Sequence, residues 1–160
     1  MTNKKITTTQ IANFICAALS LLIIILQFTP FWNFDGGSLS ISSYFWFPSD
    51  HTDLTAYLTA ELGNDYSINS IVAMPILVLV GGAAGAALCV IKSKTPYTLL
   101  IPAFVGAVGA WGFLTKPAYQ LGGNWVLQLI ICIVLLVFAV AALVYGIKKE
   151  IDESKKTDRE

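Results

Sequence analysis

The chain has 160 residues, of which 56% are hydrophobic and only 12% are charged. Soluble domains carry about 25% charged residues, so this composition excludes an ordinary water-soluble fold. Ten basic and ten acidic residues give a formal net charge of zero, yet the two signs are separated along the chain.

The apolar residues gather into four blocks, which we predict to be transmembrane α-helices. A helix rises about 1.5 Å per residue, so about twenty residues cross the hydrocarbon of a bilayer. The predicted spans cover residues 10–32, 69–91, 97–114 and 125–147. The sequence therefore predicts an all-α integral membrane protein, built as a four-helix up-down bundle that forms a single domain over residues 1–160.

The first block has some features of a signal peptide, because Lys4 and Lys5 precede an apolar run. The run is longer than the apolar region of a signal peptide, and no small-x-small cleavage site follows it. We expect this block to remain in the protein as the first span.

Residues 33–68 form a long predicted loop on the outer side of the membrane. Gly36 and Gly37 suit a tight turn between aromatic and alternating segments, which predicts a short β-hairpin. Residues 48–63 begin with capping residues, end at Gly63 and carry apolar residues at helical spacing. This pattern predicts an amphipathic helix that lies on the outer end of the bundle or in the headgroup layer.

The same loop is acidic and rich in aromatic residues. It has no Lys or Arg, so its potential is negative, which favours cations or basic protein surfaces and argues against nucleic-acid binding. Exposed aromatic side chains would form a partner-binding patch. The candidate partner-binding residues are Tyr44, Phe45, Trp46, Phe47, Asp50 and Asp53.

Two interpretations of Asp50, His51 and Asp53 stay open. Carboxylates and an imidazole can bind a divalent cation. Acidic residues in the first turn of a helix also cap it and stabilise its dipole. The second interpretation is sufficient, so we predict no metal site, no cofactor and no catalytic residue.

Small residues mark the second and third spans. Gly81 and Gly85 form a G-x-x-x-G pair, and Gly106 and Ala110 lie in the third span. Small residues let helices approach closely in lipid, and the short connection 92–96 makes these two spans an antiparallel hairpin. We therefore predict that the second span packs on the third; self-association between chains is the alternative use of the glycines.

The predicted spans contain no Asp, Glu, Lys, Arg or His, which argues against a proton-coupled carrier, an intramembrane protease and a metalloenzyme. Cys16, Cys89 and Cys132 lie within spans and are interpreted as small apolar residues. The polar residues in apolar surroundings are Asn13, Ser20, Gln27 and Gln128. Because the two glutamines lie at about the same depth, we predict that they hydrogen-bond between the first and fourth spans, with a polar ligand site as the alternative.

The basic residues set the orientation, because Lys and Arg of short loops stay on the cytoplasmic side. If the N-terminus is cytoplasmic, Lys116 alone falls outside. We therefore predict a multi-pass protein of the cell (plasma or inner) membrane with both termini cytoplasmic. The tail 148–160 is expected to continue the last helix for one or two turns into the cytoplasm.

Four spans with a long, aromatic first outer loop resemble the layout of claudin-type four-span proteins. The claudin loop pairs a tryptophan motif with two cysteines, whereas this loop region has Trp32 and Trp46 and no cysteine. The resemblance therefore concerns topology and transfers no residue role.

The expected function is that of a non-enzymatic membrane protein whose outer loop binds a protein partner or a second copy. The alternative is a small transport protein, or a transporter subunit, for an uncharged or weakly polar solute.

Overall fold

The computed structural model describes residues 6–30, 32–34, 37–40, 56, 60, 68–115 and 124–157. In chain order its elements are helix α1 (Thr8–Leu26), strands β1 (Trp32–Phe34) and β2 (Gly37–Leu39), helix α4 (Ile68–Ile91), the 3-10 helix η1 (Pro96–Leu99), helix α5 (Leu100–Leu114) and helix α6 (Trp125–Thr157).

Four helices are long and apolar enough to cross a membrane, as the composition predicts. They cover Thr8–Leu26, Ala73–Ile91, Pro96–Leu114 and Trp125–Lys156. The chain is thus a multi-pass membrane protein by the length and composition of these helices. α1 begins at a capping box, in which Thr7 Oγ1 accepts the backbone N–H of Gln10 and the Gln10 side chain accepts the N–H of Thr7.

Two helix ends differ from the predicted spans. α1 ends at Leu26, before the predicted limit at residue 32, because Pro30 follows and the chain then enters β1. α6 continues to Thr157, which is further than the one or two extra turns expected after residue 147. A charged segment can remain helical outside lipid when i,i+4 pairs support it, as Lys149 and Glu153 do at 3.8 Å.

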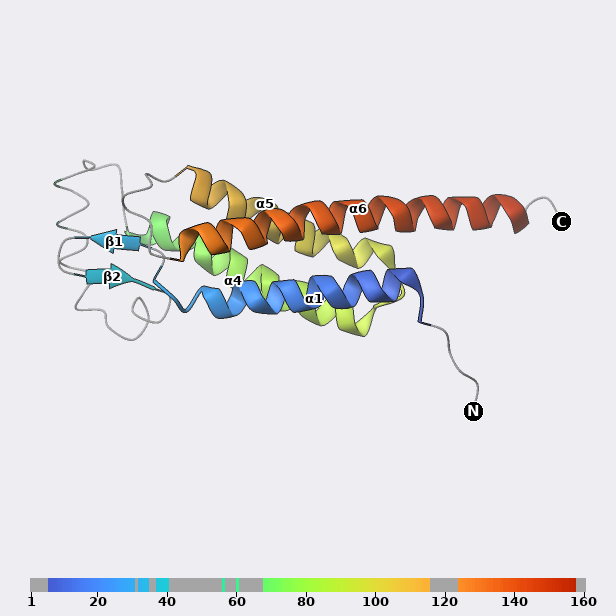
Figure 1. Cartoon of the computed structure of the whole chain (residues 1–160), viewed down its shortest axis with the longest axis horizontal. Helices are drawn as coiled ribbons and strands as arrows, with labels where there is room; N and C mark the ends of the chain where they lie inside the picture. Colours follow the sequence, from blue (N-terminus) through green and yellow to red (C-terminus); the bar gives the residue numbers. More distant parts are fainter. Residues whose placement is uncertain are drawn as a thin grey trace.

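The helices form a closed bundle (Figure 1). Each helix contacts the next in chain order, and α6 also contacts α1. β1 and β2 lie at one end, which we call the strand end, whereas the start of α1 and the end of α6 lie at the other. We call that second end the lysine end, since Lys92 and Lys94 lie in the turn after α4 and Lys148 and Lys149 lie in the last part of α6.

The two strands pair antiparallel, with Trp32 opposite Leu39 and Phe34 opposite Gly37. The turn of the predicted hairpin, at residues 35 and 36, lies outside the described residues. So does nearly all of the predicted amphipathic helix, of which the structure describes Ala56 and Ala60.

The glycines of α4 lie at its contacts with two neighbouring helices. A Cβ atom at Gly81 would lie 2.8 Å from Val105 Cγ2 of α5, and one at Gly85 would lie 3.3 Å from Ile101 Cγ2. A Cβ atom at Gly82 would instead approach α1, at 3.1 Å from Ile24 Cγ1. α4 therefore uses its small residues on both sides.

Gly106 of α5 faces α6 rather than α4. A Cβ atom there would lie 2.7 Å from the carbonyl oxygen of Cys132 and 2.7 Å from the backbone nitrogen of Leu136. Ala110, one turn further along α5, is buried. The sequence pattern predicts both residues at the contact with α4. At Gly106 the nearest atoms belong instead to the backbone of α6, so the prediction is wrong for this residue.

A leucine at position 85 is expected to lower stability in detergent more than a leucine at position 141. Gly85→Leu would force Ile101 and Pro102 of α5 away from α4, and such overpacking costs about 1–3 kcal/mol. Ala141 is exposed on α6, so Ala141→Leu is the matched control. The readout is the melting temperature of the purified protein, and equal shifts for the two variants would contradict a tight contact at Gly85.

Candidate functional site

The predicted partner-binding residues, Tyr44, Phe45, Trp46, Phe47, Asp50 and Asp53, lie outside the described residues. The alternatives for Asp50, His51 and Asp53 therefore remain predictions. The described residues do include the strand end of the bundle, where the chain leaves β2 before these residues and enters α4 after them.

A glutamine pair joins α1 and α6 near the strand end, which confirms the predicted hydrogen bond between the first and fourth spans. Gln27 Nε2 donates to Gln128 Oε1 at 3.1 Å. Gln128 Nε2 donates in turn to the Leu26 carbonyl at 3.2 Å and to Thr29 Oγ1 at 3.3 Å. Both glutamines are almost fully buried, with 1% of their surface exposed. In lipid such bonds hold helices together, because an unpaired amide has no water to bond to.

The glutamine pair is not symmetric. Gln128 uses its carbonyl oxygen and its amide nitrogen, whereas Gln27 Oε1 is buried without a hydrogen-bond partner. Ser20 Oγ, about two turns earlier in α1, is also buried and unpartnered. Gln27 therefore retains the capacity to accept one more hydrogen bond.

A second polar cluster closes the lysine end. Asn13 is fully buried in α1, and its Nδ2 donates to the Ser93 carbonyl at 3.0 Å, in the turn after α4. Thr98 Oγ1 of η1 lies 2.6 Å from Asn13 Oδ1. Asn13 thus fixes α1 to the connection between α4 and α5. The sequence indicates that Asn13 is unusual, because it is a polar residue in an apolar helix. Its hydrogen-bond partners are mostly backbone carbonyls, and these cannot be identified from residue types.

The described residues offer little chemistry for catalysis. No Asp, Glu, Lys, Arg or His is buried among them, and they include no group of three His, Cys, Asp or Glu side chains that could hold a metal ion. Cys16, Cys89 and Cys132 are buried and free. The polar groups of the bundle interior mainly bind one another across helices, which is a structural role.

Surface grooves are the feature that the sequence did not predict. One groove of about 480 Å³ lies between α4 and α5 and includes Met74, Phe104 and Trp111. Another, of about 270 Å³, lies between α1 and α6, and we call it the α1–α6 groove. Its lining residues are Thr8, Thr9, Ala12, Phe138, Ala141, Ala142 and Tyr145.

The α6 side of the α1–α6 groove does leave a trace in the sequence. Phe138, Ala141, Ala142 and Tyr145 follow the three- and four-residue spacing of one helix face. The same face continues into a second pocket near the end of α6, whose lining includes Lys148 and Lys149 together with Asp152 and Glu153. A mainly apolar stripe that ends in lysines is thus the signal that would have indicated the groove.

Comparison with models of protein families, with curated proteins and with solved structures finds no match to this chain. The likeness to claudin-type proteins therefore remains one of layout. The function of the chain has to be inferred from its own residues and their arrangement.

Proposed function

We propose that the chain is a non-enzymatic protein of the cell membrane that binds a protein partner, or a second copy of itself, through residues 33–68. The observation that carries this proposal is the closed interior of the bundle. The Gln27–Gln128 bond joins α1 to α6, and the described spans bury no charged side chain. The residues suited to recognition are therefore concentrated in the aromatic and acidic segment between β1 and α4.

The composition of this segment supports a protein partner over a small ligand. Interface energy is concentrated in a few aromatic side chains such as Trp and Tyr, and the stretch from Tyr44 to Phe47 contains four consecutive aromatic residues. Asp50 and Asp53 follow directly and would attract a basic surface. We place the segment on the outer side, with both termini in the cytoplasm, because Lys92, Lys94 and the lysines in the last part of α6 belong on the cytoplasmic side.

Cysteine labelling tests this orientation. Single cysteines at Ser42 and Thr59 are expected to react with a membrane-impermeant thiol reagent in intact cells, whereas a cysteine at Ser93 is expected to react only after the cells are opened. Cys16, Cys89 and Cys132 are buried and give the unlabelled background. Labelling at Ser93 alone in intact cells would reverse the proposed orientation.

The binding role is tested by replacing Trp46. Trp46→Ala is expected to reduce the amount of partner, or of a tagged second copy, that co-purifies in mild detergent by about tenfold or more, since a central aromatic residue can contribute 2 kcal/mol or more to an interface. Asp50→Asn with Asp53→Asn is expected mainly to weaken the salt dependence of association, because rim charges act on the association rate.

Two controls make this test decisive. The Trp46→Ala protein must keep the melting temperature and monodispersity of the parent, and Trp111→Ala, at an exposed site on α5, provides a matched loss of one tryptophan. The transport alternative predicts another pattern: solute flux into liposomes that Gln27→Leu abolishes and that Trp46→Ala leaves intact. That pattern would refute the binding proposal.

A further inference from the structure

The α1–α6 groove is apolar along most of its length and opens on the outside of the bundle. Ala12 of α1 and Ala141 and Ala142 of α6 have short side chains, which leaves the space between the helices. Tyr145 lies at the lysine end of the groove with 53% of its surface exposed. One turn further, Lys148 and Lys149 lie on the same helix face, at three and four residues from Tyr145.

The polar mouth of the groove lies at the depth of the lipid headgroups. Gln27 and Gln128 are hydrogen-bonded, so they mark one level in the antiparallel helices α1 and α6. Thr8 lies nineteen residues before Gln27, and Ile147 lies nineteen residues after Gln128, so these two residues share a second level. Nineteen helical residues span about 28 Å, close to the roughly 30 Å of a hydrocarbon core. With the glutamine pair taken as one limit of the hydrocarbon, Thr8, Lys148 and Lys149 lie at the opposite limit.

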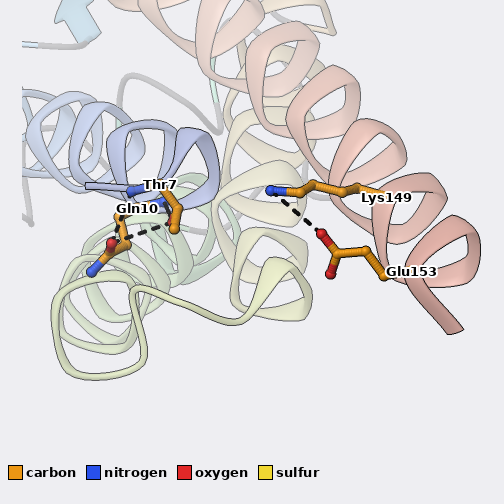
Figure 2. A network of polar contacts seen from close by, with 4 residues as sticks. All are labelled: Thr7, Gln10, Lys149 and Glu153. Atoms are coloured by element: carbon orange, nitrogen blue, oxygen red, sulfur yellow. Dashed lines mark hydrogen bonds and ion pairs between the residues drawn. The ribbon is translucent and has the colours of Figure 1, made fainter. Parts of the chain in front are cut away.

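This mouth is positively charged from two sides. The first turn of α1 contains no acidic residue, and the backbone N–H groups of Thr8 and Thr9 have no acceptor within the helix. Lys148 and Lys149 provide two ammonium groups from α6. The pocket that they line also contains Lys156, Asp152 and Glu153, so its lysines exceed its carboxylates by one. Figure 2 shows the start of α1, with Thr7 and Gln10, in one view with Lys149 and Glu153.

The ion pair of Lys149 does not remove its charge from the mouth. Lys149 Nζ lies 3.8 Å from Glu153 Oε1, and both side chains are exposed, at 44% and 67%. An exposed pair of this kind contributes little free energy, so the ammonium can turn to a stronger anion. Glu153 is one turn further from the bilayer.

We propose that the α1–α6 groove binds one anionic phospholipid from the leaflet at the lysine end. One acyl chain lies against Phe138 and the alanines, and the phosphate accepts hydrogen bonds from the first turn of α1 and from Lys148 and Lys149. The charge favours an anionic lipid over a zwitterionic one, whose own cationic group would lie near the lysines. A second copy in a symmetric contact would bring two pairs of lysines together, which is unfavourable. This proposal does not depend on the role of residues 33–68.

Lipid binding to the purified full chain tests the proposal. Native mass spectrometry with dioleoylphosphatidylglycerol and dioleoylphosphatidylcholine is expected to show tighter binding of the phosphatidylglycerol. Lys148→Gln with Lys149→Gln is expected to weaken phosphatidylglycerol binding roughly 25-fold, since each lysine near an anionic headgroup contributes about a fivefold change. Ala141→Phe, which fills the groove from an exposed position, is expected to weaken the binding of phosphatidylglycerol to a similar extent.

Each variant has a matched control. Lys92→Gln with Lys155→Gln makes the same charge change at two exposed positions that line neither the groove nor its lysine pocket, and Ala83→Phe makes the same volume change at an exposed position of α4. Both are expected to bind phosphatidylglycerol like the parent. All variants are compared at unchanged melting temperature without added lipid. Equal affinity of the parent for both lipids, or unchanged binding in the two groove variants, would overturn the proposal. A change of oligomeric state in Ala141→Phe would overturn it in favour of a second copy as the occupant.

Discussion

Gly106→Ala is expected to destabilise the protein by about 2–3 kcal/mol, measured as a loss of melting temperature in detergent. The added methyl group would lie 2.7 Å from the carbonyl oxygen of Cys132 and from the backbone nitrogen of Leu136. Backbone atoms cannot rotate away as side chains do, so α5 and α6 must separate, and overpacking of this kind costs about 1–3 kcal/mol. The better helix propensity of alanine offsets only part of this cost.

Gly85→Ala is the matched control for this prediction. A Cβ atom there lies 3.3 Å or more from the nearest side-chain atoms, which can move by a few tenths of an ångström. We expect a small change of either sign at Gly85. If Gly106→Ala kept the parent melting temperature, the close approach of α5 and α6 at this point would be wrong.

The glutamine pair leads to the second prediction, in which the two members have unequal effects. Gln128→Leu is expected to cost about 1–3 kcal/mol, because it leaves Gln27 Nε2 buried without an acceptor and removes the bonds to the Leu26 carbonyl and Thr29. Gln27→Leu is expected to cost less. It removes an amide whose oxygen is already unpartnered, and Gln128 keeps its bonds to α1.

A double-mutant cycle measures the coupling between the two glutamines. Gln27→Leu with Gln128→Leu is expected to cost less than the sum of the single changes, since the double variant leaves neither amide of the pair unpaired. Denaturation of the four proteins in the same detergent gives the four free energies. If the free-energy change of the double variant equalled the sum of the two single changes, the two side chains would not be energetically coupled.

The four spans could be predicted because crossing a bilayer imposes a length and a composition that each block meets on its own. The Gln27–Gln128 bond could also be predicted, because both residues are polar, lie in apolar helices and reach the same depth. Both predictions depend on distance along the membrane normal. Residue number within a helix gives this distance, because each residue rises about 1.5 Å.

The neighbour of Gly106 could not be predicted, because it depends on how the helices are rotated about their axes. The third span, Pro96–Leu114, is the most enclosed of the four, with 56% of its apolar stretch buried against 28% for the fourth span. A helix enclosed in this way needs small residues on more than one side, so its glycines do not identify one partner. The α1–α6 groove was missed for a related reason: three of its lining residues come from α1 and four from α6, and the two groups are more than a hundred residues apart in the sequence.

The separation in sequence of the two polar clusters also sets an order for assembly during synthesis. Asn13 bonds to a carbonyl 80 residues later in the chain, whereas the partner of Gln27 is 101 residues later. At about 5–20 residues per second, the ribosome needs roughly 5–20 s to reach Gln128 after it has made Gln27. Ser93 is made 35 residues before Gln128, so in about the last third of that interval Asn13 can engage the turn after α4 while Gln27 still has no partner from α6. The nascent protein thus joins its helices at the lysine end before it can close them at the strand end.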